Sequence, residues 1–141
     1  MFSALHRLTR HLMRFTVAAC LGLCLMLTAC SGDSASTLTG DYVEDTVAVV
    51  HTLQSTIAMA QDDDGRSEAE SSATALIDDY MSRYRPRPQV NGLSSFTTMQ
   101  TALNSLAGHY KTYANRPLPE TLRTRVDKEL AKAEKAVVRG S

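Results

Sequence analysis

The 141-residue sequence has no tryptophan, only three phenylalanines and five tyrosines, and few turn formers, with seven glycines and four prolines. So few aromatic side chains argue against a β-sandwich or β-barrel, where strands favour them. Three cysteines cannot support a disulfide scaffold. Neither sign of charge is in excess, because fifteen basic residues balance fifteen acidic ones, which argues against a nucleic-acid-binding protein. The apolar fraction of 43% excludes a disordered chain.

The amino terminus carries a basic segment followed by an uncharged, mainly apolar run. Arg7, Arg10 and Arg14 precede this run, which covers the 13 residues 15–27. Thirteen residues are too few for a membrane-spanning helix, which needs about 20. A basic head with a short apolar body is typical of a secretory signal.

The residues that end this run, Leu27, Thr28, Ala29 and Cys30, resemble a bacterial lipobox, in which the cysteine thiol takes a diacylglycerol and the chain is cut before it. We therefore predict that residues 1–29 are a cleaved signal peptide and that Cys30 is the lipid-modified terminus, carrying palmitate-type chains. An uncleaved anchor or a generic signal is the alternative. Cleavage removes the other two cysteines, so the mature chain has no free thiol for a metal or a nucleophile.

The mature chain divides into a tether and a domain. Residues 31–39 are mainly Ser, Gly, Thr and Ala and have no apolar period, which is typical of a flexible linker. We predict a lipidated flexible tether at residues 30–39 and a folded domain at residues 40–141. Asp41 with Glu44, and Ser67 with Glu70, have the spacing of helix capping pairs.

Four apolar stripes with helical spacing occupy the domain, separated by breakers at residues 62–65, 86–92 and 115–119. The stripes are Val43, Val47, Val50, Leu53 and Ile57; Ala69, Ala73, Leu76, Ile77, Tyr80 and Tyr84; Phe96, Met99, Leu103, Leu106, Tyr110 and Tyr113; and Leu122, Val126, Leu130, Ala133 and Val137. No window alternates with the period of a strand. The sequence therefore predicts an all-α, up-down-up-down four-helix bundle, because four one-sided helices must bury their stripes against one another.

Residues that could carry catalysis or bind a metal are sparse. The acidic run at residues 62–65 fits part of a calcium loop, but Ala60 and Ser71 would occupy its first and last ligand positions, so a solvated turn is the better interpretation. His51 and His109 have no partner identifiable from spacing, and we interpret them as surface or interface histidines. No hydrolase, metalloprotease or nucleotide-binding fingerprint occurs. We predict no enzymatic activity, no catalytic residue, no cofactor and no metal.

Two features of the helices leave alternatives open. Gly108 interrupts the third stripe at a cost of about 1 kcal/mol relative to Ala, and the close approach of a neighbouring helix explains it better than a partner does. The fourth helix carries a basic stripe that indicates a solvated face or, alternatively, a docking surface. The stripe comprises Arg125, Lys128, Lys132, Lys135 and Arg139.

Three segments carry a family resemblance. Residues 95–110 read SFTTMQTALNSLAGHY, residues 79–85 read DYMSRYR, and residues 116–120 read RPLPE. Together with the lipobox, they closely resemble the Psb27 family of photosystem II assembly and repair lipoproteins in its cyanobacterial form. The likeness extends over residues 40–140.

The resemblance implies a non-enzymatic, monomeric four-helix protein, lipid-anchored on the lumenal side of the thylakoid membrane. Its implied partners are photosystem II core assembly intermediates, chiefly the large lumenal loop of the inner-antenna chlorophyll protein CP43. Binding would precede the manganese cluster and the extrinsic subunits. Two other functions compete: a generic envelope lipoprotein that binds another membrane complex, and a metal-handling chaperone, against which the missing ligand cluster argues.

Two sets of candidate site residues follow. Asn104, His109, Arg116 and Pro117 match the family pattern yet lie off or beyond the apolar seam, so we expect them to be exposed and to bind the partner. The second set lies at the lipidated end of the predicted bundle, which would be basic, while the turn at residues 62–64 would make the opposite end acidic. That basic end, which we expect to face the membrane unless it is merely solvated, comprises Arg83, Arg85 and Arg87 with Lys135 and Arg139.

Overall fold

The computed structural model describes residues 37–114 and 116–141, so Cys30 and the predicted signal peptide lie outside the described residues. The described residues contain four long helices and one short helix, and no strand. In chain order these are α2 (Tyr42–Ala58), α3 (Arg66–Tyr84), α4 (Pro88–Asn91), α5 (Ser94–Thr112) and α6 (Glu120–Val138). The predicted all-α fold is confirmed.

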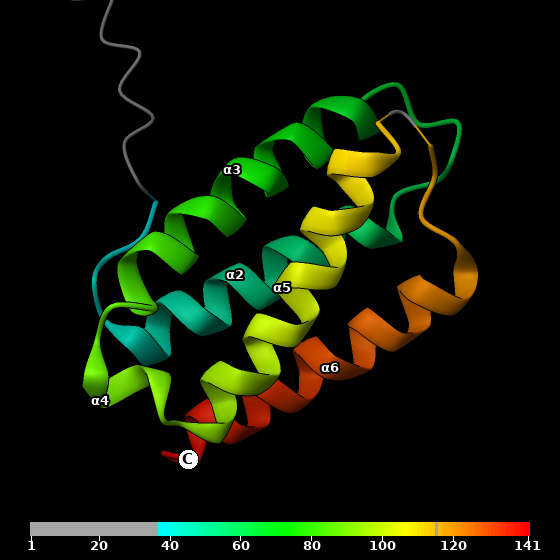
Figure 1. Cartoon of the computed structure of the whole chain (residues 1–141). Helices are drawn as coiled ribbons and strands as arrows, with labels where there is room; N and C mark the ends of the chain where they lie inside the picture. Colours follow the sequence, from blue (N-terminus) through cyan, green and yellow to red (C-terminus); the bar gives the residue numbers. More distant parts are fainter. Residues whose placement is uncertain (1–36, 115) are drawn as a thin grey trace, which may run out of the picture. The chain divides into compact units, whose positions relative to one another are not determined.

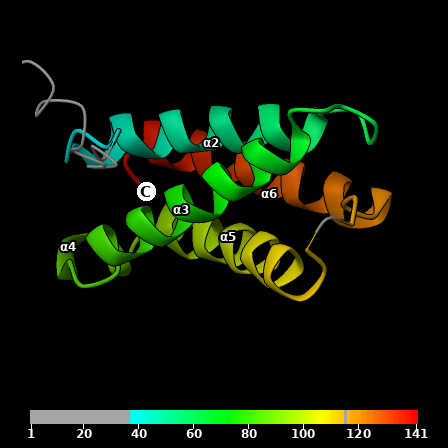
Figure 2. The same ribbon diagram turned by 90° about the horizontal axis from the view of Figure 1, so that it is seen from above.

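The four long helices form a closed ring in which each packs against two others (Figure 1). α2 packs against α3 and α6, and α5 packs against the same two helices. Figure 2 shows the two resulting layers, α2 beside α6 and α3 beside α5. Consecutive long helices run in opposite directions, so the predicted up-down-up-down bundle is also confirmed.

The helix starts follow local hydrogen-bond chemistry, and one of two predicted caps is wrong. The Asp41 carboxylate accepts the Glu44 N–H at 2.9 Å, as expected for an N-cap. Ser67 is not the N-cap residue, because α3 already begins at Arg66 and its N-cap residue is Gly65. The Asp63 carboxylate accepts the Gly65 N–H at 2.8 Å, so the acidic turn supplies its own acceptor and starts the helix earlier.

The predicted breaker at residues 86–92 contains the short helix α4, which the sequence analysis did not anticipate. Pro88 is its first residue, and the fixed φ of proline suits a first helical turn. Its one buried side chain, Val90, joins the main core. The connection between α3 and α5 is thereby anchored rather than free.

Most residues of the four predicted apolar stripes are buried. These are Val50, Leu53, Ile57, Ala73, Ile77, Tyr80, Tyr84, Phe96, Met99, Leu103, Leu106, Val126, Leu130, Ala133 and Val137. Leu122 and Val47 are only half-buried, and Val43 is 44% exposed. The buried face of α2 is rotated from the predicted stripe, because Thr46 and Val49 take the interior positions instead.

A buried polar cluster explains this rotation. Thr46 donates to the Tyr42 carbonyl at 2.6 Å and lies 2.7 Å from the Tyr80 hydroxyl. Asp45, only 1% exposed, accepts a hydrogen bond from the Tyr84 hydroxyl. Burial first, and then the hydrogen bond to Asp45, raises the pKa of Tyr84, so its hydroxyl stays protonated as a donor. The hydrogen bonds between these side chains offset the free-energy cost of burying their polar groups.

The packed part of the domain begins before Gly40, the predicted start of the domain. Leu38 is 7% exposed and belongs to the core. The Thr39 N–H donates to the Asp45 carboxylate at 2.7 Å, and the Gly40 N–H donates to it at 3.0 Å. Residues 38 and 39 are therefore part of the folded domain and not of a free tether.

Candidate functional site

The exit of α5 contains three of the four predicted partner-binding residues. His109 is 8% exposed, so the expectation that it is a surface residue is wrong. Its Nε2 lies 3.3 Å from the Arg116 carbonyl oxygen, and its ring packs 5.4 Å from that of Tyr113. The Tyr113 ring and the Arg116 carbonyl therefore lie against the imidazole. His109 therefore contacts the residues that follow α5, and its role in binding a partner stays a prediction.

The exposed residues of this exit include Tyr113, Arg116 and Pro117. The Arg116 guanidinium lies 5.8 Å from the centroid of the Tyr113 ring, within the range of a cation–π contact. Arg and Tyr side chains are the commonest anchors of protein interfaces. Arg116 and Pro117 are thus exposed as expected.

Tyr113 was missed as a surface residue, because the spacing placed it at the end of the apolar seam. It is 48% exposed, since α5 ends at Thr112 and Tyr113 follows in a non-helical conformation with φ of −126°. Its side chain therefore leaves the helical face that the seam occupies. The predicted breaker at residues 115–119 begins two residues later, and this proximity could have indicated that Tyr113 lies beyond the helix.

Asn104 lies elsewhere on α5. It is exposed, as expected, but it precedes His109 by five residues, about 7.5 Å along the helix axis. It shares a face with Gly108, four residues on. An added Cβ at Gly108 would meet no atom within 4 Å, so the interpretation of a closely approaching helix is wrong. The structure does not bring Asn104 into the His109 cluster.

The three arginines of the predicted basic end differ in their surroundings. Arg87 donates to the Gly40 carbonyl at 3.2 Å, and its guanidinium lies 4.7 Å above the Tyr84 ring. Arg83 is half-buried, whereas Arg85 is exposed. Arg87 therefore helps to hold the segment before α2, and Arg85 is the most accessible of the three charges.

The charged ends of the bundle lie where the topology predicted. The Ser95 N–H donates to the Ser141 carbonyl at 3.1 Å, and the Tyr42 and Ser95 hydroxyls lie 2.9 Å apart. These contacts join the start of α2, the start of α5 and the end of α6. Lys135 and Arg139, exposed near the end of α6, belong to this basic end. The acidic turn at residues 62–64 lies at the far end of α2 (Figure 1).

The basic stripe of α6 borders a shallow hollow of about 440 Å³. The hollow is lined by Lys128, Lys132, Lys135 and Arg139 together with Ala131, Ala136 and Ser141. Four cations around small side chains are compatible with an acidic partner segment as well as with solvent. The structure thus leaves both interpretations of this stripe open.

The remaining features concern metals and membranes. His51 is a surface histidine, as expected, with its Nε2 3.0 Å from a Glu134 carboxylate oxygen. Within residues 37–114 and 116–141, no three His, Cys, Asp or Glu side chains are grouped closely enough to hold a metal ion. In the same part of the chain, no helix has both the length and the apolar character needed to cross a bilayer.

Comparison with known proteins gives a consistent result. The family model described as Photosystem II Pbs27 matches residues 7–137. The chain is 48% identical over 124 residues to the photosystem II lipoprotein Psb27 of Synechocystis sp., covering 88% of this chain and 91% of that protein. It is 42% identical over 129 residues to the photosystem II assembly factor lipoprotein Psb27 of Thermosynechococcus vestitus, covering 89% and 96%.

A solved structure of the same family has a similar fold. The solution structure of Psb27 from cyanobacterial photosystem II superposes with a TM-score of 0.74 at 49% sequence identity. The match covers 79% of this chain and 96% of that one. The four-helix arrangement described above is therefore shared with this relative.

Proposed function

Because the chain belongs to the photosystem II Psb27 (Pbs27) family, we propose that it is an assembly and repair factor of photosystem II that acts by binding. The observation that carries this proposal is the family match, which extends over residues 7–137. The proposed site of action is the lumenal side of the thylakoid membrane. The proposed partner is the large lumenal loop of CP43, bound before the manganese cluster and the extrinsic subunits are in place.

The proposal includes a lipid anchor at Cys30, supported by the lipobox after a short apolar run. The intact mass of the mature protein should show the loss of residues 1–29 and the addition of lipid. A Cys30→Ser variant should accumulate as an uncut precursor. If that variant is cut at the same place and still fractionates fully with membranes, the anchor lies elsewhere.

The proposed docking surface is the exit of α5, extended along the outer face of that helix to Asn104. The exposed Arg116–Tyr113 pair and the adjacent Pro117 supply an aromatic ring, a cation and a rigid apolar group. His109 contributes indirectly, because its contact with the Arg116 carbonyl fixes the connection. A surface fixed in advance loses less conformational entropy when it binds.

Calorimetric titration of the isolated CP43 lumenal loop into the mature lipoprotein tests this function. Arg116→Ala should weaken binding about tenfold or more, as loss of an interface arginine does. Asn104→Ala should weaken it less. Both variants should keep the wild-type thermal melt, because both side chains are exposed.

Arg139→Ala is the matched control, since it removes an exposed arginine from the basic hollow at the other end of the molecule. Weakening by Arg139→Ala alone would move the docking surface to α6 and leave the partner unchanged. A wild-type protein that does not bind the loop at all would refute the proposed partner.

A further inference from the structure

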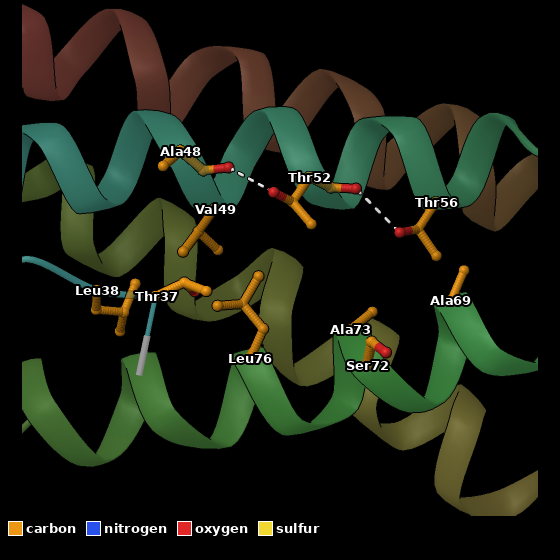
Figure 3. A pocket seen from close by; sticks show the side chains of 10 residues that line it. All are labelled: Thr37, Leu38, Ala48, Val49, Thr52, Thr56, Ala69, Ser72, Ala73 and Leu76. Carbon is orange, nitrogen blue, oxygen red and sulfur yellow. Dashed lines mark hydrogen bonds between the residues drawn. The ribbon is translucent and has the colours of Figure 1, made fainter. Parts of the chain in front are cut away.

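A groove of about 460 Å³ runs between α2 and α3 (Figure 3). Ligand sites occupy about 300–1,000 Å³, so the groove can hold a small molecule or a chain segment. Val49 and Ala73, each 1% exposed, line its interior together with the half-buried Leu76. The long helices thus leave an apolar channel unfilled on this side of the bundle.

Two of the four hydroxyl groups that line the groove are engaged within α2. The Thr52 hydroxyl donates to the Ala48 carbonyl at 2.9 Å, and the Thr56 hydroxyl donates to the Thr52 carbonyl at 2.9 Å (Figure 3). Both threonines therefore have no hydroxyl hydrogen to offer a ligand, and no charged residue occurs among the 10 that line the groove. Six of the ten lining residues are Ala, Val or Leu, and none is charged, so the groove suits an uncharged and mainly apolar occupant.

The amino-terminal segment leads into this groove. Thr37 and Leu38 line one of its ends, between α2 and α3 (Figure 3). Cys30 precedes Thr37 by seven residues, which span at most about 25 Å when extended. A lipid on Cys30 is thus tethered within reach of the groove, whatever path the intervening residues take.

The length of the groove also suits an acyl chain. Its α2 wall extends from Ala48 to Thr56, eight residue steps or about 12 Å of helix. An extended acyl chain spans about half of the ~30 Å hydrocarbon core of a bilayer. We propose that this groove shelters one acyl chain of the lipid carried by Cys30, an inference that rests on the lipidation included in the proposed function.

A sheltered chain has a consequence for attachment. An acyl chain in the groove is removed from water without entering the bilayer, so it does not contribute to membrane binding. The remaining acyl chains then hold the protein more weakly. The groove thereby lets the protein move from the bilayer surface onto its partner, and return, without exposing that chain to water.

Photo-crosslinking in intact cells tests the proposal. Cells that express the full chain are grown with a diazirine-bearing palmitate and irradiated. The mature lipoprotein is then purified and digested with trypsin. No Lys or Arg occurs between Cys30 and Arg66, and the next cleavage site is Arg83. Cys30 and the α3 wall therefore lie on separate peptides, residues 30–66 and 67–83. We expect a crosslinked species that joins these two peptides.

Ser72→Phe supplies the groove-filling variant, and Ser71→Phe is its control. Both serines are exposed on α3, but only Ser72 lines the groove. Ser72→Phe should reduce the crosslink about tenfold, whereas Ser71→Phe should leave it at the wild-type level. The thermal melts of both variants, compared with the wild type, check that the bundle is intact.

Three outcomes would overturn the proposal, and they are distinguishable. Label on Cys30 without a crosslink to residues 67–83 would leave the lipidation standing and refute the sheltering. If the peptide of residues 67–83 is crosslinked to labelled lipid but not to the peptide of residues 30–66, the groove binds bilayer lipid instead. A mature chain without label on Cys30 would refute the lipidation itself and, with it, the occupant.

Discussion

The Tyr84 hydroxyl, on the last residue of α3, donates a hydrogen bond to the buried carboxylate of Asp45 in the first turn of α2. The same carboxylate accepts the N–H groups of Thr39 and Gly40. One acidic side chain therefore fixes the segment ahead of α2 to two helices. Because Leu38 lies in that segment, this cluster also shapes the end of the groove where the amino-terminal residues enter.

Removing the Tyr84 hydroxyl should weaken this cluster. Tyr84→Phe deletes a donor to a charged acceptor, and we expect a loss of about 1.5–3 kcal/mol in the free energy of unfolding. Denaturant titration of a form beginning at Ser31, which retains all the residues that the structure describes, measures it. Tyr113→Phe, at an exposed ring, is the control and should change stability by less than about 0.5 kcal/mol. Equal small effects in both variants would contradict the role given to Tyr84.

Asp45 should make stability depend on acid pH. Burial alone would raise the pKa of Asp45, but hydrogen bonds from Tyr84, Gly40 and Thr39 lower it below its ordinary value. A depressed pKa in the folded state adds stability that is fully present above the unfolded-state value of about 3.9 and is lost as the pH falls through the folded value.

The corresponding variant is Asp45→Asn, which cannot titrate. Its free energy of unfolding should be lower than that of the wild type at neutral pH and should fall less steeply below about pH 4. Urea titrations at a series of pH values give both slopes. Asp62→Asn removes an exposed carboxylate from the acidic turn and is the matched control. Parallel slopes for the wild type and Asp45→Asn would rule out the proposed linkage.

The apolar period predicted the helices well and the buried face of α2 poorly. The apolar period assigns Val43 and Val47 to the buried face of α2. It assigns Asp45 and Thr46 to the exposed face, because it considers only apolar side chains as candidates for burial. Whether a polar side chain can be buried depends on a hydrogen-bond partner, and here the partners lie 34 and 39 residues away in the sequence. Local pattern contains no information about such pairs.

The same limit applies to the candidate site. His109 is buried, and the Tyr113 ring and the Arg116 carbonyl, both beyond the end of α5, lie against its imidazole. The path of a connection is set by its own turn geometry and not by the helical period. The charged ends of the bundle, by contrast, followed from helix count and order alone, since antiparallel topology determines which residues share an end.

The basic end should attract anionic membranes. Each cation near an anionic surface contributes about 1 kcal/mol and acts within a Debye length. A form beginning at Ser31, without lipid, should therefore co-sediment weakly with anionic liposomes and be released by moderate salt. Arg85→Ala should reduce binding more than Arg87→Ala, because Arg85 is exposed whereas Arg87 is committed to Gly40. Equal sedimentation with neutral and anionic liposomes would show that this end does not orient the protein.

Two glycines should respond to the same substitution with opposite signs. Gly108 lies in the interior of α5, where an added Cβ meets nothing within 4 Å, so Gly108→Ala should raise the free energy of unfolding by about 0.5–1 kcal/mol. Gly40 has a φ of +96°, a conformation that strains any L side chain, and its N–H and carbonyl hold Asp45 and Arg87. Gly40→Ala should therefore lower stability by about 1 kcal/mol or more. Thermal and urea unfolding of the two variants measure both changes. A loss of stability on Gly108→Ala would mean that a neighbouring group approaches α5 there after all, whereas no effect at Gly40 would mean that the segment before α2 is not held in the described conformation.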